Sequence, residues 1–434
     1  MALTGQQPNR INTVMTSFIA QYHDQLEVTG LSHEFGGWIA RRPFRYLDPI
    51  YPGAFADARV QLHQKIKDLH ASNAIRLAAL PGDYVRPHAN ECEKGPLAAD
   101  RVKAILWGTA IGDALGNTSE SMTASDRRRG HGEIRHYLPN PHAGEQRIGL
   151  PSDDTQLTVW TLEVLLEKGD PDLQVLARAY RDQRIFGIGR TMRQFFRDLE
   201  KTGTSKEKVW LARQHRAGNG ALMRVAGAFL PHAWTLDAGL LDTVAITSAF
   251  THDDPSSTAA CVAFARILAD LLYLKKPVAD GWFCEAFLET AGPIEGSVKL
   301  PSRVPGDSFE GSVCDMVKQR VMPALKEEGL SVSTACDRWY SGAFLLETVP
   351  SILYILERYK SDPQEAIRRA VMDTWDNDTV AAIVGAVMGA MHGMEAFATA
   401  WLECLPGRTT EDDDGRLDRV YSRLRALGGS GLND

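Results

Sequence analysis

In the stretch Gly149-Leu-Pro-Ser-Asp-Asp-Thr-Gln156, two adjacent carboxylates stand directly before an apolar helical run, and this stretch decides the fold. The run covers Leu157–Leu166, and Gly169 ends it. Ser152 stands at the N-cap position, where its hydroxyl can accept a hydrogen bond from a backbone N–H of the first turn. Carboxylates in a first turn also favour the helix dipole. Taken alone, the presence of Asp153 and Asp154 is therefore explained by their favourable interaction with the helix N-terminus.

A second acidic helix start lies near the other end of the chain. Asp376-Asn-Asp-Thr379 precedes the run Val380–Met391, which is small and apolar nearly all round. Such a helix must be buried, and buried carboxylates need a neutralising partner. Together with the hydroxyls of Ser152 and Thr379, these aspartates offer only oxygen ligands, which suit Mg²⁺ or Mn²⁺ rather than Zn²⁺. The two starts predict a two-metal site with the ions about 3.5–4 Å apart; the alternative is that each acidic pair only stabilises its own helix.

The bulk composition is that of a soluble globular protein. The chain has 434 residues, of which 44% are hydrophobic and 24% charged, and its net charge of −7 argues against a general nucleic-acid or membrane-surface binder. It has no run of about 18 apolar residues and no signal-peptide pattern, so we expect a cytoplasmic protein without a membrane span. The six cysteines lie far apart, without zinc or disulfide spacing.

The hydrophobic pattern predicts an all-α fold. Helix follows helix from residue 157 on, without convincing alternation of apolar and polar residues. An apolar helix over 97–116 carries Gly108, Gly112 and Gly116 at a spacing of four, a stripe that lets another backbone approach closely. The polar connection 117–151 leads into the first acidic start, and 292–311 is expected to be a surface loop. The later helices are expected at 155–168, 171–184, 189–201, 221–230, 236–250, 256–274, 280–291, 312–328, 342–358, 363–373, 379–393 and 395–404.

Residues 1–95 are expected to form a helical, aromatic-rich extension, and 96–434 the main domain. The stretch 35–55 contains six aromatic residues, and a helix is expected over 56–80. The extension is too small to bury much core alone. Its aromatics either pack onto the main domain or face a protein partner, where aromatic residues are enriched.

Two further stretches fit a binding site. Gly218-Asn219-Gly220 begins a polar turn at a helix start, which suits backbone N–H contacts to a phosphate; the alternative is an ordinary turn. His252 stands at another helix start, although a single histidine is more often structural. No Ser-His-Asp or Cys-His arrangement with recognisable spacing appears, so nucleophilic catalysis has no support.

Together these residues resemble the ADP-ribosylglycohydrolase family, the relatives of dinitrogenase reductase-activating glycohydrolase. The matching motifs follow the family's order over roughly 97–405. They are Gly112-Asp113-x-x-Gly116-x-x-x-Glu120, Ser152-Asp153-Asp154-Thr155-Gln156, Gly218-Asn219-Gly220-x-x-Met223-Arg224, Thr251-His252 and Asp376-x-Asp378-Thr379. The resemblance implies a compact all-α fold with a binuclear Mg²⁺ or Mn²⁺ centre that removes ADP-ribose from modified side chains, often arginine.

The resemblance also implies a role for each matching residue. The two divalent cations would be held by Ser152, Asp153, Asp154, Asp376, Asp378 and Thr379. The ADP-ribose pocket would be lined by Gly218, Asn219, Gly220 and His252. Glu120, on a loop near the metals, or Asp154 would handle the proton during hydrolysis of an N-glycosidic bond. Trp375 and Asn377 depart from the family's usual glycine and threonine, which affects the expected substrate preference more than metal binding.

The extension 1–95 lies outside the family's core. Its combination with such a hydrolase resembles the immunity proteins of bacterial type VI secretion ADP-ribosyltransferase toxins. The resemblance implies an ADP-ribosylarginine hydrolase that acts on an ADP-ribosylated protein and binds a cognate toxin through residues 1–95. The alternative is a binding protein that mainly blocks the toxin through this extension. A metal phosphohydrolase using His252 and Asp253 is a third reading, but the sequence lacks the further ordered His and Asp it would need.

Overall fold

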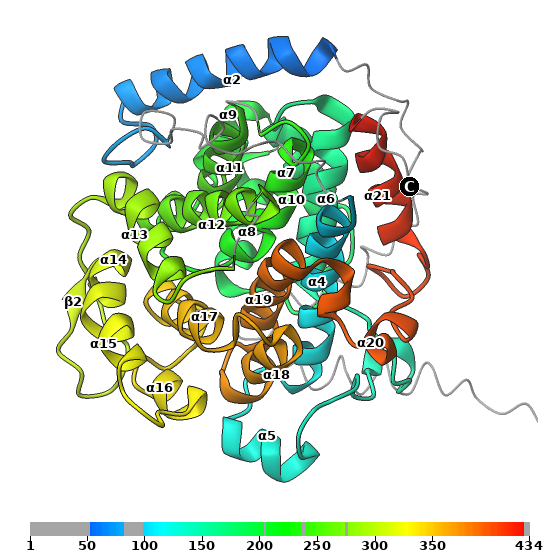
Figure 1. Ribbon diagram of the computed structural model, residues 1–434. Helices are drawn as coiled ribbons and strands as arrows, with labels where there is room; N and C mark the ends of the chain where they lie inside the picture. Colours follow the sequence, from blue (N-terminus) through cyan, green and yellow to red (C-terminus); the bar gives the residue numbers. More distant parts are fainter. Residues whose placement is uncertain (1–52, 82–98, 204, 237–238, 274–276, 429–434) are drawn as a thin grey trace, which may run out of the picture. The chain divides into compact units, whose positions relative to one another are not determined.

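The computed structural model describes residues 53–81, 99–203, 205–236, 239–273 and 277–428, which all belong to one compact unit. Nearly all regular structure in these ranges is helical, which confirms the all-α prediction (Figure 1). The described α-helices are α2 (Gly53–Ala71), α4 (Ala99–Gly116), α5 (Ala124–His131), α6 (Asp153–Lys168), α7 (Leu173–Arg181), α8 (Arg190–Thr202), α9 (Lys206–Leu211), α10 (Val225–Phe229), α11 (Gly239–Ala249), α12 (Pro255–Tyr273), α13 (Trp282–Glu295), α14 (Val313–Met316), α15 (Met322–Leu325), α16 (Val332–Asp337), α17 (Leu345–Tyr359), α18 (Pro363–Asp373), α19 (Asn377–His392), α20 (Thr399–Glu403) and α21 (Arg416–Leu427).

Short elements connect these helices. A two-stranded antiparallel sheet pairs β1 (Leu300–Pro301) with β2 (Glu310–Gly311). One π-helical segment, η7 (Val317–Val321), lies between α14 and α15. The described 3₁₀ turns are η3 (Asn117–Ser119), η4 (Pro141–Ala143), η5 (Leu222–Arg224), η6 (Leu230–His232) and η8 (Gly393–Ala396).

Most expected helices are present with ends shifted by a few residues, and the differences have local causes. The helix expected over 312–328 is interrupted by η7, because Pro323 has no N–H to continue the regular hydrogen-bond pattern. The loop expected over 292–311 contains the last turn of α13 and the β1–β2 pair. Helices α5, α9 and α16 were missed, since they are at most eight residues long and too short to show a clear period.

Helices α4 and α19 pack against each other backbone to backbone. The predicted glycine stripe makes this contact: a β-carbon at Gly108 would overlap the backbone of Gly385, and one at Gly112 would overlap that of Ala381. At the end of the stripe, Gly116 lies against the backbone of Asp378. The close approach therefore fixes where the second acidic start lies relative to α4.

Within the described ranges, two helical segments are long and apolar enough to cross a membrane by length and composition, Pro255–Tyr273 and Asn377–Ala396. Their apolar windows are 83% and 78% buried inside the protein, as is usual for core helices. Both contribute side chains to one large hydrophobic core, which α4, α6 and α17 complete.

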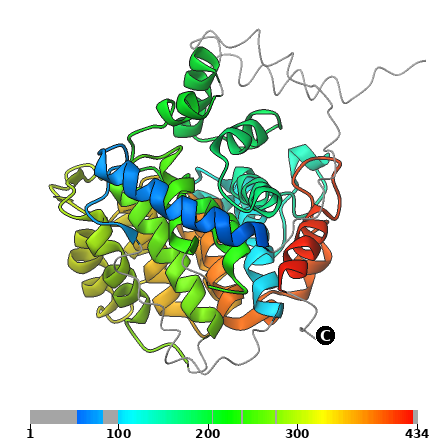
Figure 2. The same ribbon diagram turned by 90° about the horizontal axis from the view of Figure 1, so that it is seen from above.

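Helix α2, which falls within the predicted extension, packs on α11 (Figure 2). His63 Nδ1 lies 2.8 Å from Oδ2 of the buried Asp242, and Leu62 and Ile66 join the main core. The helix expected over 56–80 ends at Ala71. The side chains of the aromatic-rich stretch 35–55 lie outside the described residues, and the boundary at residue 95 stays a prediction.

The close packing of α4 on α19 gives a test of stability. We expect Gly112→Ala to destabilise the protein by several kcal/mol or to prevent folding, because the added methyl group meets the backbone of a buried helix that has no room to move. The matched control is Gly130→Ala in α5, where only Met122 Cε lies near the added β-carbon, at 3.8 Å. This change should stabilise the protein by about 0.5–1 kcal/mol. Urea unfolding measures both, and equal midpoints for the two variants would contradict the packing argument.

Candidate active site

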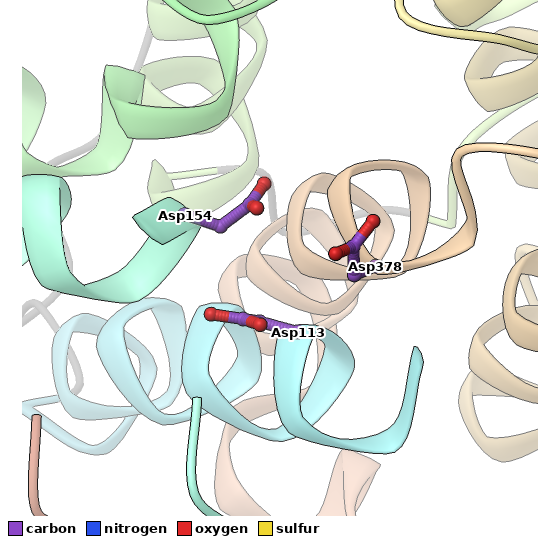
Figure 3. A group of neighbouring side chains, drawn as sticks. All are labelled: Asp113, Asp154 and Asp378. Carbon is purple, nitrogen blue, oxygen red and sulfur yellow. The ribbon is translucent and has the colours of Figure 1, made fainter. Parts of the chain in front are cut away.

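Three buried carboxylates meet where α4, α6 and α19 converge (Figure 3). Asp113, Asp154 and Asp378 each offer an oxygen atom, and these oxygens lie within 4.8 Å of one another. A second group with the same spacing consists of Glu120, Asp376 and Asp378. Asp378 belongs to both groups. The structure therefore brings the two predicted acidic helix starts together and gives two adjacent positions that are rich in carboxylate oxygens.

Asp113 is a member of this site that the sequence analysis quotes within a matching motif but to which it assigns no role. Its carboxylate is fully buried and accepts hydrogen bonds from the backbone N–H groups of Ser152 and Thr155 and from both of their hydroxyls, at 2.7–3.0 Å. It therefore caps α6 from a neighbouring helix. A signal was present in the sequence, because a charged residue on an apolar helix that must be buried needs partners.

The predicted capping role of Ser152 is wrong in one respect. Ser152 does stand at the N-cap of α6, but its hydroxyl makes no capping hydrogen bond and donates to Asp113 at 2.7 Å instead. A carboxylate is the stronger acceptor, and its charge favours the helix N-terminus. Asp113 therefore takes over the capping and holds Ser152 beside the acidic groups.

Asp153 belongs to neither carboxylate group. Its N–H donates to the carbonyl of Phe186 at 2.8 Å, and its side chain forms part of the cavity wall. Thr379 also lines the cavity, and its role as a metal ligand stays a prediction. Asn377 does not reach the cavity wall: its amide donates to Gly116 O, Ser119 Oγ and Val371 O, and so joins the ends of α4 and α18 to α19.

Burial and mutual repulsion disfavour ionisation throughout this cluster. Burial, followed by the neighbouring carboxylates, raises the pKa of Asp153, Asp154 and Asp378 well above the ordinary range. Burial also raises the pKa of Asp113. Glu120 is exposed as a residue, yet its carboxyl group is crowded by protein, and this desolvation with the charges of Asp376 and Asp113 raises its pKa to about 7.

The residues fit divalent cations. All ligand atoms are oxygens, and Oδ1 of Asp154 is buried without a hydrogen-bond partner in the described structure. A cation would satisfy that oxygen and would favour the ionised carboxylates. Mg²⁺ and Mn²⁺ prefer such oxygen ligands.

A cavity of about 470 Å³ opens onto the carboxylates, within the usual range for a small-molecule site. Its wall combines the acidic residues with the predicted Gly218, Asn219, Gly220 and His252. It also includes Arg190, Arg216 and Arg303, which sequence reasoning did not assign. An acidic cluster beside glycine backbone and guanidinium groups can receive a ligand that carries both hydroxyl groups and phosphates.

The predicted binding residues contact one another. The ring of the buried His252 lies under Gly220, where an added β-carbon would come within 3.0 Å of the imidazole Nε2. Burial and the nearby Arg224 hold the pKa of His252 well below its ordinary value, so the ring is neutral at pH 7. Asn219 Nδ2 donates to Asp376 Oδ2, so this amide orients a site carboxylate.

Two buried arginines hold the loops of the site. Arg224 donates to Gly220 O and to the hydroxyl of Thr251, next to His252. Arg127 donates to Ser119 Oγ, Ser119 O and Met122 O, and on the other side to Met372 O and Thr374 O, at 2.9–3.1 Å. Arg127 therefore ties the loop that carries Glu120 to the segment before Asp376.

The comparisons with known proteins agree with this site. The ADP-ribosylglycohydrolase family matches residues 95–428, and the chain belongs to this family. It is therefore a hydrolase of ADP-ribose conjugates. The family depends on metal ions, as the clustered carboxylates also indicate.

Three relatives illustrate the range of similarity. The ADP-ribosyl-[dinitrogen reductase] glycohydrolase of Rhodospirillum rubrum is 24% identical over 77% of this chain and 99% of its own. The ADP-ribosylarginine hydrolase Tri1 of Pseudomonas putida is 25% identical over 70% of this chain and 74% of its own. The ADP-ribosylhydrolase ARH3 of Xenopus tropicalis is 23% identical over 74% of this chain and 96% of its own. A solved structure of an ADP-ribosylglycohydrolase-related protein complex matches the fold with a TM-score of 0.52 at 22% identity, over 77% of this chain and 99% of that one.

The buried Arg127 offers a test of how the Glu120 loop is held. Arg127→Met leaves five buried acceptor contacts without their donor, and we expect a loss of about 3 kcal/mol or more in the free energy of unfolding. The matched control is Arg129→Met, two residues along the same helix, where the side chain is 77% exposed and should contribute less than about 0.5 kcal/mol. Urea unfolding of both variants measures the difference. Similar losses would show that Arg127 does not hold the loop.

Proposed function

We propose that the protein hydrolyses the N-glycosidic bond between ADP-ribose and the guanidinium group of arginine in a modified protein. The observation that carries this proposal is that two clusters of three carboxylates share Asp378, which lines the cavity. The named activity of the Pseudomonas putida relative supports the same linkage.

The cations are proposed to bind through Asp113, Asp154 and Asp378 at one position and through Asp376 and Asp378 at the other, with the carboxylate of Glu120 beside the second position. When bound, two divalent ions supply positive charge that stabilises oxygen atoms on which negative charge develops. Asn219 holds the Asp376 carboxylate in place by its hydrogen bond. Ser152 and Thr155 do the same for Asp113.

Other residues of the protein are proposed to bind the ADP-ribose and to transfer the proton. The Gly218–Gly220 turn and the neutral His252 line the cavity where ADP-ribose is proposed to bind. Of the two proton-transfer candidates, we favour Glu120, because it stands on a short loop that water reaches, whereas Asp154 is buried among the ligands. Water adds to the anomeric carbon as the bond to the guanidine nitrogen breaks. Its proton passes by way of the carboxylate to the leaving nitrogen.

Removal of the shared carboxylate tests this function. We expect Asp378→Asn to lower kcat/KM for release of ADP-ribose from an ADP-ribosylarginine protein by on the order of 100-fold or more. Even the mutation of a residue that only hydrogen-bonds to a metal ligand often lowers activity or metal affinity about 10–100-fold. Chelation with EDTA should abolish the activity, and Mg²⁺ or Mn²⁺ should restore it in the unmodified protein only. The control is Asp280→Asn, whose side chain is fully exposed and should not affect the rate. Full activity of the Asp378 variant would refute the proposed site.

A second role is proposed for the N-terminal extension, because the family match begins only at residue 95. On this proposal the extension binds a cognate ADP-ribosyltransferase toxin, and the chain acts as its immunity protein. Deletion of residues 1–48, which belong to the predicted extension, should abolish toxin binding in a pull-down assay and leave hydrolysis unchanged. Normal toxin binding by the shortened chain would rule out this role for 1–48.

A further inference from the structure

Two aromatic rings stack on each other beside the cavity. The ring centroids of Tyr340 and Trp375 lie 5.4 Å apart, and their planes differ by 29°. Tyr340 is 42% exposed, and only Leu211 among the large hydrophobic residues of the described chain is more exposed. Trp375 is partly buried. An exposed aromatic pair of this kind is a common feature of binding surfaces rather than of packed cores.

The tryptophan is joined directly to the acidic site. Trp375 immediately precedes Asp376, which lines the cavity. Its carbonyl accepts a hydrogen bond at 3.3 Å from the N–H of Ser121, the residue that follows Glu120. The backbone of Trp375 therefore joins the Glu120 loop to the start of α19.

The tyrosine is joined to the same edge. Ser341, the next residue, accepts the N–H of Asp376 with its carbonyl at 3.1 Å and the N–H of Trp375 with its hydroxyl at 3.0 Å. Ala343 and Phe344, a few residues further along, line the cavity. The aromatic pair is therefore fixed to the rim of the cavity by backbone hydrogen bonds.

The backbone that carries the tyrosine is strained. Tyr340 and Ser341 have φ values of +76° and +50°, in the left-handed region that non-glycine residues rarely adopt. A bulky residue at such a position costs free energy, and such strain gathers at functional sites. Here the strained turn presents an aromatic ring to solvent at the rim, which a glycine would not do.

We propose that Tyr340 and Trp375 form a platform that receives the guanidinium group and aliphatic stem of the modified arginine. The inference rests on the proposed function and names the residues that select the linkage. A planar, delocalised cation stacks favourably on aromatic faces. A serine linkage is small and neutral, so it gains little from the platform.

The experiment compares ring removal with ring retention. Tyr340→Asn removes the ring but tolerates the left-handed backbone, and Trp375→Ala removes the indole. Tyr340→Phe and Trp375→Phe keep an aromatic face. The readouts are kcat/KM on an ADP-ribosylated arginine peptide, the inhibition constant of a matched ADP-ribosylated serine peptide used as competitor, and the inhibition constant of free ADP-ribose. Leu211→Ala is the control for loss of an exposed apolar side chain at a residue that is 70% exposed and does not line the cavity.

The two ring-removing variants should each lose about 2- to 30-fold in kcat/KM on the arginine peptide, the range of one cation–π contact. Both inhibition constants should stay within about twofold of the wild type, which is within the spread of a neutral surface change. The phenylalanine variants should keep most of the activity, and the control should keep all of it. Thermal unfolding of each variant confirms that the fold is intact.

Three outcomes would overturn the inference. If the ring-removing variants also bound free ADP-ribose more weakly, the platform would be assigned to binding the adenine or the diphosphate. If they bound the serine peptide more weakly by the same factor, the platform would act independently of the guanidinium group. Unchanged activity of the ring-removing variants, with an active wild type, would refute the platform while leaving the proposed function intact. A wild type that does not release ADP-ribose from arginine would refute the proposed function, and the platform with it.

Discussion

The backbone contact between α4 and α19 is the constraint on which the site depends. Glycine on one helix faces glycine or alanine on the other, so the axes come closer than larger side chains would allow. Because the contact continues to Gly116 and Asp378, it brings the C-terminal end of α4 to the N-terminal end of α19. Asp113 and Asp378 are placed together by this contact, and α6 adds Asp154.

This arrangement concentrates negative charge where water is scarce. The acidic residues repel each other, and burial raises their pKa values further. The protein stabilises the arrangement with donors placed around its edge. Hydroxyl and amide groups hold Asp113 and Asp376. Two buried guanidinium groups, of Arg127 and Arg224, fix the surrounding loops through backbone carbonyls. Cations complete a site that the protein has largely organised in advance.

Much of this was predictable from local sequence. The helical period gave the all-α class, the glycine stripe gave the close packing, and the two acidic starts indicated that distant carboxylates meet. The sequence motif contains Asp113 but does not reveal its role, because its partners Ser152 and Thr155 lie about 40 residues away in the chain. For the same reason the hydroxyl of Ser152 was assigned to the helix end that Asp113 caps. The short helix α5 was missed because its polar sequence shows no apolar face, although its Arg127 proves to be buried.

The hydrogen bonds of Arg127 have a consequence for biosynthesis. Its acceptors at Met372 and Thr374 lie 245 and 247 residues further along the chain, and the partner helix of α4 follows them. During translation, Asp113, Asp154 and Arg127 therefore lack these partners until residues 372–392 have been synthesised. A chain that ends before α19 lacks Asp376 and Asp378, leaves the glycine face of α4 uncovered and offers an apolar surface to chaperones and proteases. The acidic site therefore forms only after α19 has been synthesised.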